Sequence, residues 1–198
     1  MKIYTKRGDK GITSLYDSSK VSKSHILIET LGAVDELNCE LGMIFACSSH
    51  IKNDIVELAY LQNIQHLLFT MGSIIAMPKK KDLTEIVLDK DGIVINQLEE
   101  YIDIMTDKLP KLRNFILPGS GYRKAEYEDE RYNMILVAAI HRARAVCRRT
   151  ECKLTTTALT SKSIELNCLK IINRLSDYLF TLARYICWFT HLDELTHI

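Results

Sequence analysis

Four arginines lie within eight residues of each other in the stretch His141-Arg142-Ala143-Arg144-Ala145-Val146-Cys147-Arg148-Arg149-Thr150-Glu151. A guanidinium group is planar, carries five N–H donors and stays charged at physiological pH, so it suits a phosphate or a carboxylate. Glu151 is the one acid within the stretch that could balance this charge. The chemistry to expect here is the binding of an anion.

The same stretch has the pattern of a helix with two different faces. Small and apolar residues recur at alternating spacings of three and four, which predicts a stripe that packs against other helices. The residues of this stripe are Ile140, Ala143, Cys147, Thr150 and Leu154. His141, Arg144, Arg148 and Glu151 each follow one position later, so we expect their side chains to lie beside the stripe and to be partly buried. The alternative is an ordinary solvated basic face.

Helical patterns dominate the chain after its first 24 residues. They cover Ile26–Cys47, residues 53–77, residues 95–109, the arginine stretch and residues 164–188, and all three prolines fall outside them. Helices of this length are typical of an antiparallel bundle. We therefore predict an all-α fold, a five-helix antiparallel bundle in one domain over residues 1–198. Within it, residues 1–24 form an ordered N-terminal loop, residues 25–190 the bundle and residues 191–198 a tail.

The N-terminal loop is polar and has one motif of interest. Gly8-Asp9-Lys10-Gly11-Ile12-Thr13-Ser14 places two glycines where backbone amides could turn toward an anion, with hydroxyl donors directly after them. The motif is neither a Walker A loop nor a Rossmann fingerprint. We expect a short extended piece at residues 3–5. The alternative for the whole segment is a frayed chain end.

Composition limits the classes of function. The net charge is +1, so a basic site must be local, and broad electrostatic attachment to nucleic acid or to a membrane surface is not expected. Six cysteines form no C-x-x-C pair, which predicts reduced core residues in a cytoplasmic protein. Neither a secretory leader nor a transit segment is visible, and the longest wholly apolar run, residues 135–140, is too short to span a bilayer.

Several chemistries find little support in the residues. A di-iron bundle needs two Glu-x-x-His motifs, and only Glu194-Leu195-Thr196-His197 fits. The chain has no G-x-S-x-G motif and no papain-like cysteine context, which argues against a covalent nucleophile. A basic helical module that binds nucleic acid remains an alternative, although no aromatic residue interrupts the arginine stretch.

Six motifs follow one another over nearly the whole chain. They are Ile3-Tyr4-Thr5-Lys6-x-Gly8-Asp9-x-Gly11, Val21-Ser22-Lys23, Gly32-x-Val34-Asp35-Glu36-Leu37-Asn38, Phe115-x-Leu117-Pro118-Gly119, Arg144-x-x-Cys147-Arg148-Arg149-x-Glu151 and Asn173-Arg174-Leu175-Ser176-Asp177-Tyr178-Leu179-Phe180. Together they resemble the PduO-type ATP:cob(I)alamin adenosyltransferases. Six separated motifs in order are far more specific than any one of them.

The resemblance implies a five-helix bundle that assembles as a homotrimer, with an active site at each subunit interface. Such an enzyme transfers the 5′-deoxyadenosyl group of ATP to the cobalt of cob(I)alamin, which forms adenosylcobalamin and releases triphosphate, with Mg²⁺ on the phosphates. Cob(I)alamin is itself the nucleophile, which agrees with the lack of a catalytic serine or cysteine. A cobalamin reductase or an adenosylcobalamin-dependent enzyme is a further candidate partner. A bundle that carries corrinoid without turnover is the remaining alternative.

The resemblance also implies residue roles. The N-terminal loop would wrap the nucleotide through Thr5, Lys6, Arg7, Gly8, Thr13, Ser14 and Lys23. The helices would complete the ATP site with Arg148, Arg149, Glu151 and Asn173. Asp35 and Arg144 would form an interface pair on the corrinoid side, and Phe115 would pack below the corrin and help to displace the lower axial base. Arg148, Asp35, Arg144 and Phe115 are thus the residues expected to act in catalysis, and no metal ligand is assigned.

The chain departs from the family pattern at four places. Ser14, Ser24 and Ser120 replace residues that are commonly glycine, aspartate and glycine. Residues 122–131 lengthen the usual short link into the arginine helix, and they could begin that helix or form a loop before it.

Overall fold

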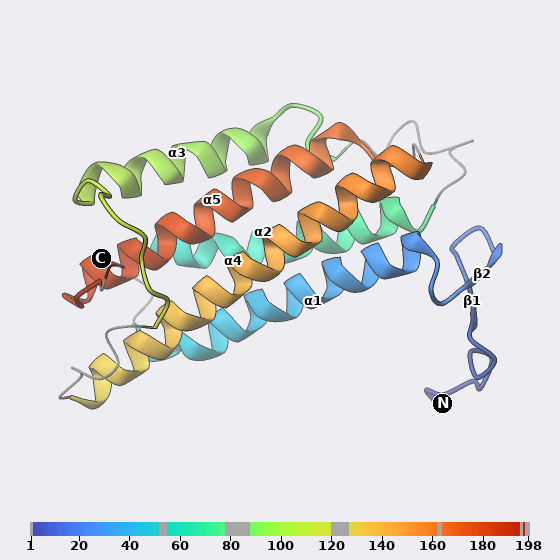
Figure 1. Cartoon of the computed structure of the whole chain (residues 1–198), viewed down its shortest axis with the longest axis horizontal. Coiled ribbons are helices and arrows are strands. Elements are labelled where there is room, and N and C mark those ends of the chain that lie inside the picture. The colour runs from blue at the N-terminus through green and yellow to red at the C-terminus, as the bar shows by residue number, and fades with distance from the viewer. Residues whose placement is uncertain are drawn as a thin grey trace.

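The computed structural model is a bundle of helices in which successive helices run antiparallel (Figure 1). It describes residues 2–51, 55–77, 88–119, 127–161, 164–194 and 196. Within these residues the helices are α1 (Ile26–Cys47), α2 (Val56–Ile75), α3 (Ile93–Lys108), α4 (Glu128–Ser161) and α5 (Leu166–Phe189). The predicted all-α, five-helix antiparallel bundle is confirmed.

Helix α5 lies at the centre of the packing. It contacts α4, α3 and α2, while α1 packs against α4 and α2. The stripe predicted on the arginine helix is buried throughout, with Ile140, Ala143, Cys147, Thr150 and Leu154 all at 0% exposure. Each buried aliphatic side chain contributes roughly 1.5–3 kcal/mol relative to an exposed one, so these seams are what hold α4 in register with its neighbours.

Polar contacts fix the helix ends and the α1–α4 pairing. The His25 side chain caps α1 by accepting from the Leu27 amide at 3.2 Å, as expected for a capping histidine. Inside the bundle, the hydroxyls of Thr30 and Thr157 lie 2.6 Å apart and join α1 to the C-terminal half of α4. The Thr150 hydroxyl donates to the Ala33 carbonyl at 3.0 Å. These buried hydrogen bonds fix the axial position of α4 relative to α1.

The N-terminal loop contains a small hairpin instead of the extended piece expected at residues 3–5. Strands β1 (Ile12–Ser14) and β2 (Lys20–Ser22) pair antiparallel, with Ile12 opposite Ser22 and Ser14 opposite Lys20. Residues 3–5 form no strand, because a strand needs a partner and only residues 12–14 are followed by a turn that brings one back. The hairpin projects beyond the start of α1 (Figure 1).

The cysteines and the link at residues 122–131 differ in part from the expectations. Cys39 and Cys152 are exposed, so they are not core residues, whereas Cys147, Cys168 and Cys187 are buried as predicted. Of the long link at residues 122–131, residues 128–131 begin α4, and residues 120–126, with Ser120, lie outside the described part. No helix within the described residues is long and apolar enough to cross a membrane.

Candidate functional site

The N-terminal loop forms a cavity with a strongly basic lining. Its volume is about 720 Å³, and the lining consists of Thr5, Arg7, Gly8, Lys10, Ile12, Thr13, Ser14 and Lys20. Three cations and three hydroxyls face this space, and no carboxylate lines it. A phosphate chain is the ligand that such a donor set suits.

Backbone conformation shapes this cavity at two glycines. A Cβ added at Gly8 would lie 2.9 Å from the Lys23 Nζ, so the glycine lets this lysine approach the loop. Gly11 has φ +73°, a left-handed conformation that favours glycine. Its carbonyl accepts from the Lys23 amide at 2.9 Å, which ties the turn to β2. Of the residues expected to wrap a nucleotide, Thr5, Arg7, Gly8, Thr13 and Ser14 line the cavity. Lys6 and Lys23 do not.

The arginine row on α4 is less uniform than predicted. Arg144 is half-buried, with its guanidinium carbon 5.3 Å from the centre of the Phe180 ring on α5, a cation–π contact that holds its position. Arg148, one turn further, is exposed, so the expected partial burial is wrong there. The Phe180 ring covers Arg144, whereas no aromatic contact to Arg148 occurs among the described residues.

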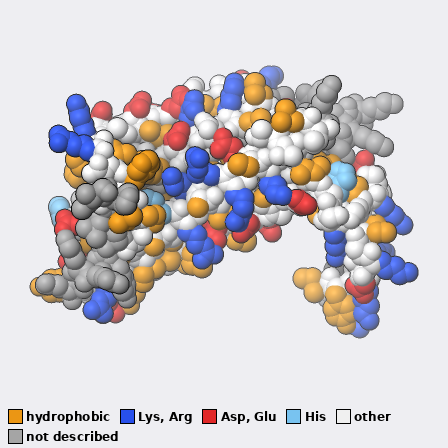
Figure 2. Space-filling model, viewed as in Figure 1, with side chains coloured by type: hydrophobic (Ala, Val, Ile, Leu, Met, Phe, Trp, Pro, Cys, Tyr) orange, Lys and Arg blue, Asp and Glu red, His pale blue; other side chains and the backbone are white. Residues whose placement is uncertain are grey.

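Three other basic residues of α4 are paired with acids of α1. Arg142 binds Glu40 at 2.7 Å and Arg149 binds Glu36 at 2.5 Å, while Lys153 bridges to Glu29. Lys and Arg side chains gather along α4 across the middle of one face, with acidic side chains among them (Figure 2). Such pairing breaks up the uniform basic surface that a nucleic-acid-binding helix would need.

Glu151 and Asn173 are joined, as a shared site requires. The Asn173 side-chain amide on α5 donates to Glu151 Oε1 on α4 at 3.0 Å. Arg174 donates to Asn173 Oδ1 at 2.9 Å and is itself held by Glu99 of α3 at 2.5 Å. Because both hydrogen bonds leave the Asn173 amide group a single orientation, its remaining N–H points in a defined direction.

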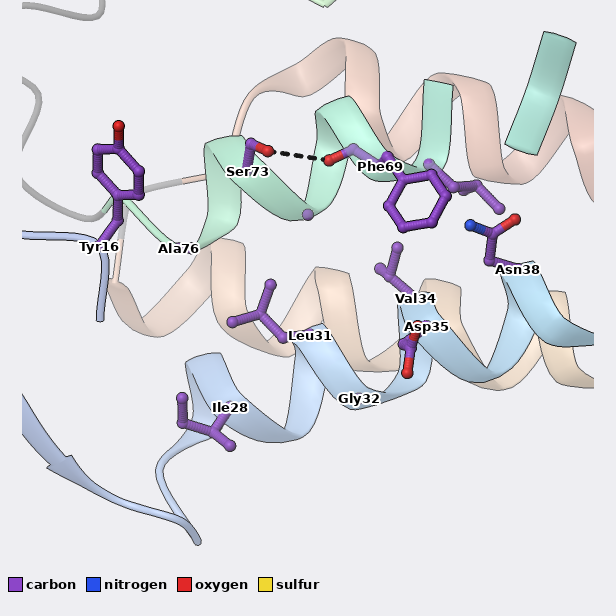
Figure 3. A pocket seen from close by; sticks show the side chains of 12 residues that line it. Tyr16, Ile28, Leu31, Gly32, Val34, Asp35, Asn38, Phe69, Ser73 and Ala76 are labelled. Carbon is purple, nitrogen blue, oxygen red and sulfur yellow. Dashed lines mark hydrogen bonds between the residues drawn. The ribbon is translucent and has the colours of Figure 1, made fainter. Parts of the chain in front are cut away.

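Asp35 lies on a different side of the molecule from Arg144. It lines a groove of about 560 Å³ between α1 and α2, where it sits at the α1 edge with Phe69 of α2 across from it (Figure 3). Phe69 and Tyr16 are 67% and 76% exposed, so this face carries aromatic surface. Arg144 instead faces α5. No ion pair joins Asp35 to Arg144 in the described part of the chain.

Phe115 stands in the connector between α3 and α4. It is 84% exposed, which is unusual for so large an apolar side chain. Ile116 forms an antiparallel bridge with Thr196 of the C-terminal tail, and the next turn passes through Gly119, whose φ is +71°. The bridge to the C-terminal tail therefore fixes the backbone of the connector, while the phenyl ring of Phe115 projects into solvent.

The cavity of the loop and the helix residues are separate within one chain. The hairpin lies beyond the start of α1 (Figure 1) and meets the bundle through Leu15 and Val21, which pack against its core. Among the described residues, no hydrogen bond or ion pair joins residues 5–14 to Arg148, Arg149, Glu151 or Asn173. Nor do the described residues contain a group of three or more His, Cys, Asp or Glu side chains that could hold a metal ion.

Comparison with known proteins agrees with the motifs. Residues 3–186 match the family model for cobalamin adenosyltransferases. The chain belongs to the cobalamin adenosyltransferase family. It is 36% identical over 188 residues to the corrinoid adenosyltransferase MMAB of Bos taurus, covering 93% of this chain and 70% of that protein. It is 34% identical over 187 residues to a corrinoid adenosyltransferase of Bacillus subtilis, covering 94% and 86%.

A solved relative has the same fold. It is a phenylalanine-to-alanine variant of the PduO-type ATP:corrinoid adenosyltransferase from Lactobacillus reuteri, complexed with cobalamin and ATP. The TM-score is 0.81 at 30% identity, and the match covers 99% of each chain. The resemblance inferred from the six motifs is thereby confirmed, and this chain is a corrinoid adenosyltransferase.

Sequence reasoning about the adenosyltransferase site missed two residues. Lys10 and Lys20 line the loop cavity. Lys10 lies within the glycine motif and could have been named, whereas Lys20 reaches the cavity only because β2 pairs with β1. His141, which belongs to the arginine row expected to be partly buried, is buried. It is 6% exposed, and burial, with the nearby Arg144 charge, lowers its pKa to about 4. A neutral histidine therefore packs beside Arg144.

Proposed function

We propose that this adenosyltransferase binds the triphosphate of ATP in the N-terminal loop cavity and transfers the 5′-deoxyadenosyl group to cob(I)alamin. The observation that carries the proposal is the cavity lining, in which Arg7, Lys10 and Lys20 face a common space together with the hydroxyls of Thr5, Thr13 and Ser14. Its counterpart is the set of polar groups on the helices, where Arg148, Arg149, Glu151 and Asn173 complete the ATP site.

The reaction requires the protein to position the two substrates and to supply positive charge at the leaving group. The electron pair of Co(I) attacks C5′ of the ribose, the cobalt–carbon bond forms and the bond from C5′ to the triphosphate oxygen breaks. The triphosphate leaves with that bond's electrons, and cobalt becomes Co(III). Negative charge grows on the leaving oxygen, so cations fixed before the reaction stabilise the transition state more than the ground state. Arg148, exposed and without an acidic partner among the described residues, is suited to this role.

The corrinoid would bind where Phe115, Asp35 and Arg144 meet. An exposed phenyl ring on a braced connector can pack against the lower face of a corrin and keep both the axial base and water from the cobalt. Removal of the lower ligand favours the Co(I) state. Phe115 thus acts by excluding a ligand, and Asp35 with Arg144 by shaping the wall beside it.

A homotrimer would bring these parts together. Within one chain Asp35 faces the α1–α2 groove while Arg144 faces α5, and among the described residues no hydrogen bond or ion pair joins the basic loop to Asn173. We propose that the pairs form between neighbouring copies, with Asp35 of one copy against Arg144 of the next. The exposed Phe69 and Tyr16 of the groove would be covered in that assembly.

Mg²⁺ belongs to the substrate in this proposal. The basic cavity offers no carboxylate, and the described residues hold no cluster that could form a metal cage. The ion would arrive on the phosphate oxygens of ATP with its own water, and no step depends on a protein ligand to it. We further propose that the enzyme works in the cytoplasm, where a cobalamin reductase supplies Co(I) and an adenosylcobalamin-dependent enzyme takes the product.

The site assignment is tested by Arg148→Ala and by Asn173→Ala. Both variants should keep the helical circular dichroism of the parent and lose turnover by about a hundredfold or more, as when a transition-state donor is removed. Arg131→Ala, an exposed arginine on the first turn of the same helix, is the matched control and should keep full turnover. Full activity of both site variants would remove Arg148 and Asn173 from the mechanism.

A further inference from the structure

A second basic cavity lies beside Phe115 and has no part in the site described above. It measures about 440 Å³ and sits between the α3–α4 connector, the end of α5 and the C-terminal tail. Lys111, Arg113 and Asn114 line it from the connector, and Arg184 and Trp188 from α5. Glu194 is the one carboxylate in the lining. The lining therefore carries three cations against one acid.

The floor of this cavity is rigid. Arg184 is 7% exposed, and its guanidinium donates to the Pro110 carbonyl at 2.9 Å and to Glu194 Oε2 at 3.3 Å. One buried arginine thus ties the connector to the tail, and the bridge from Ile116 to Thr196 ties them again six residues later. Glu194 is neutralised by Arg184. Residues 111–114, which lie between these two contacts, are exposed and line the cavity. We call this segment the strap.

The strap presents uncompensated positive charge close to Phe115. Among the described residues neither Lys111 nor Arg113 has an ion-pair partner, and both are exposed. They lie four and two residues before Phe115, so their Cα atoms are within about 15 Å of it. An anion held by this pair would therefore lie next to whatever packs on the Phe115 ring.

An aromatic surface lies on the other side of the same cavity. Trp188 stacks on Tyr185 with ring centres 5.5 Å apart and planes inclined by 22°, and it remains 44% exposed. Tyr185 is fixed in turn, because its hydroxyl accepts from Lys108 Nζ at 3.1 Å. A stacked, braced indole with exposed surface is a platform for a further planar ring.

Cobalamin carries a group with this combination of properties. A phosphodiester, a ribose and a planar benzimidazole hang from the lower face of the corrin, and this tail stays covalently attached after the base leaves cobalt. We propose that the cavity of Lys111, Arg113, Arg184 and Trp188 receives the displaced nucleotide tail, with the phosphodiester at Lys111 and Arg113 and the base against Trp188. The inference rests on the proposed function, since it needs the corrin's lower face at Phe115. It adds a subsite that recognises complete corrinoids.

The test compares cob(I)alamin with cob(I)inamide, which has a corrin but no nucleotide tail. In Lys111→Ala/Arg113→Ala, the KM for cob(I)alamin should rise about fivefold or more, because each exposed ionic contact contributes up to about that factor. The KM for cob(I)inamide should stay within about a factor of two, because this corrinoid lacks the phosphodiester that the two cations would contact. The charge-preserving Lys111→Arg/Arg113→Lys should restore the low KM, and Lys90→Ala, at the opposite end of α3, should change neither value.

Each result decides the proposal. An equal rise for both corrinoids, or no rise for cob(I)alamin, would overturn the tail subsite while leaving the adenosyltransferase intact. Absence of turnover by the parent with either corrinoid would instead overturn the proposed function. A measurement on the unaltered protein gives a further check: added salt should raise the KM for cob(I)alamin more than that for cob(I)inamide, because screening weakens an exposed phosphodiester contact. Identical salt dependence would contradict the proposal.

Discussion

The buried His141 makes folding stability depend on pH. It lies on α4 between the Phe180 ring, 6.5 Å away, and the core, and its Nδ1 has no hydrogen-bond partner among the described residues. Burial first, and then the Arg144 charge, lower its pKa from 6.5 to about 4. The folded protein therefore keeps this imidazole neutral at pH values where the unfolded chain has already bound a proton.

The sign and size of the effect follow from these two pKa values. Between pH 6.5 and pH 4 the unfolded state holds more protons, so the free energy of unfolding falls as the pH falls. The contribution is fully present above the unfolded pKa and is lost progressively below it. At pH 5 the loss relative to pH 8 is about 2 kcal/mol for this residue.

Urea denaturation of the parent and of His141→Leu at pH 8 and pH 5 would measure this loss in the free energy of unfolding. The parent should lose about 2 kcal/mol more than the variant on going from pH 8 to pH 5, whatever the two stabilities are at pH 8. His66→Gln changes an exposed histidine of α2 and should behave as the parent. If the parent and His141→Leu lose the same amount, the histidine is not held neutral by burial and the reasoning fails.

Three further outcomes test the packing and the assembly. The Thr30→Val/Thr157→Val double variant should lose less stability than the two single variants together, because either single change already removes the hydroxyl–hydroxyl contact that the two residues share; chemical denaturation of all four proteins checks this, and strict additivity would contradict it. Tyr178→Phe removes the buried bond to the Glu57 carbonyl and should lower the free energy of unfolding by about 1 kcal/mol, whereas an unchanged urea midpoint would show that the bond contributes nothing. Asp35→Arg and Arg144→Asp should each weaken the proposed trimer in analytical ultracentrifugation and the combined reversal should restore it; a combined variant as weak as either single one would remove the proposed pair.

Most of the fold could be predicted because its signals are local. Helix α1 matches its predicted bounds of Ile26–Cys47, since a capping histidine precedes it and an apolar stripe runs through it. The seam of α4 was likewise readable from spacing alone. Cys39 could have been placed correctly too, because it lies off the stripe marked by Leu37 and Leu41.

The features that sequence reasoning missed depend on the neighbour across an interface. Arg144 is half-buried beneath the Phe180 ring of α5 whereas Arg148, one turn further, is exposed, and no pattern within α4 carries that information. Lys20 enters the basic cavity through strand pairing with Ser14. Nor could spacing show that Asp35 and Arg144 face different sides of one chain, which is the geometry that makes a second copy necessary for the proposed pair.

The most direct test of the central claim is a single anaerobic assay. Purified protein is mixed with chemically reduced cob(I)alamin, Mg²⁺ and ATP, and the corrinoid absorbance is followed while released triphosphate is quantified. We expect conversion of the cob(I)alamin spectrum to that of adenosylcobalamin, with one triphosphate released for each corrinoid converted. A cob(I)alamin spectrum that persists, under conditions in which a known adenosyltransferase completes the reaction, would contradict the central claim.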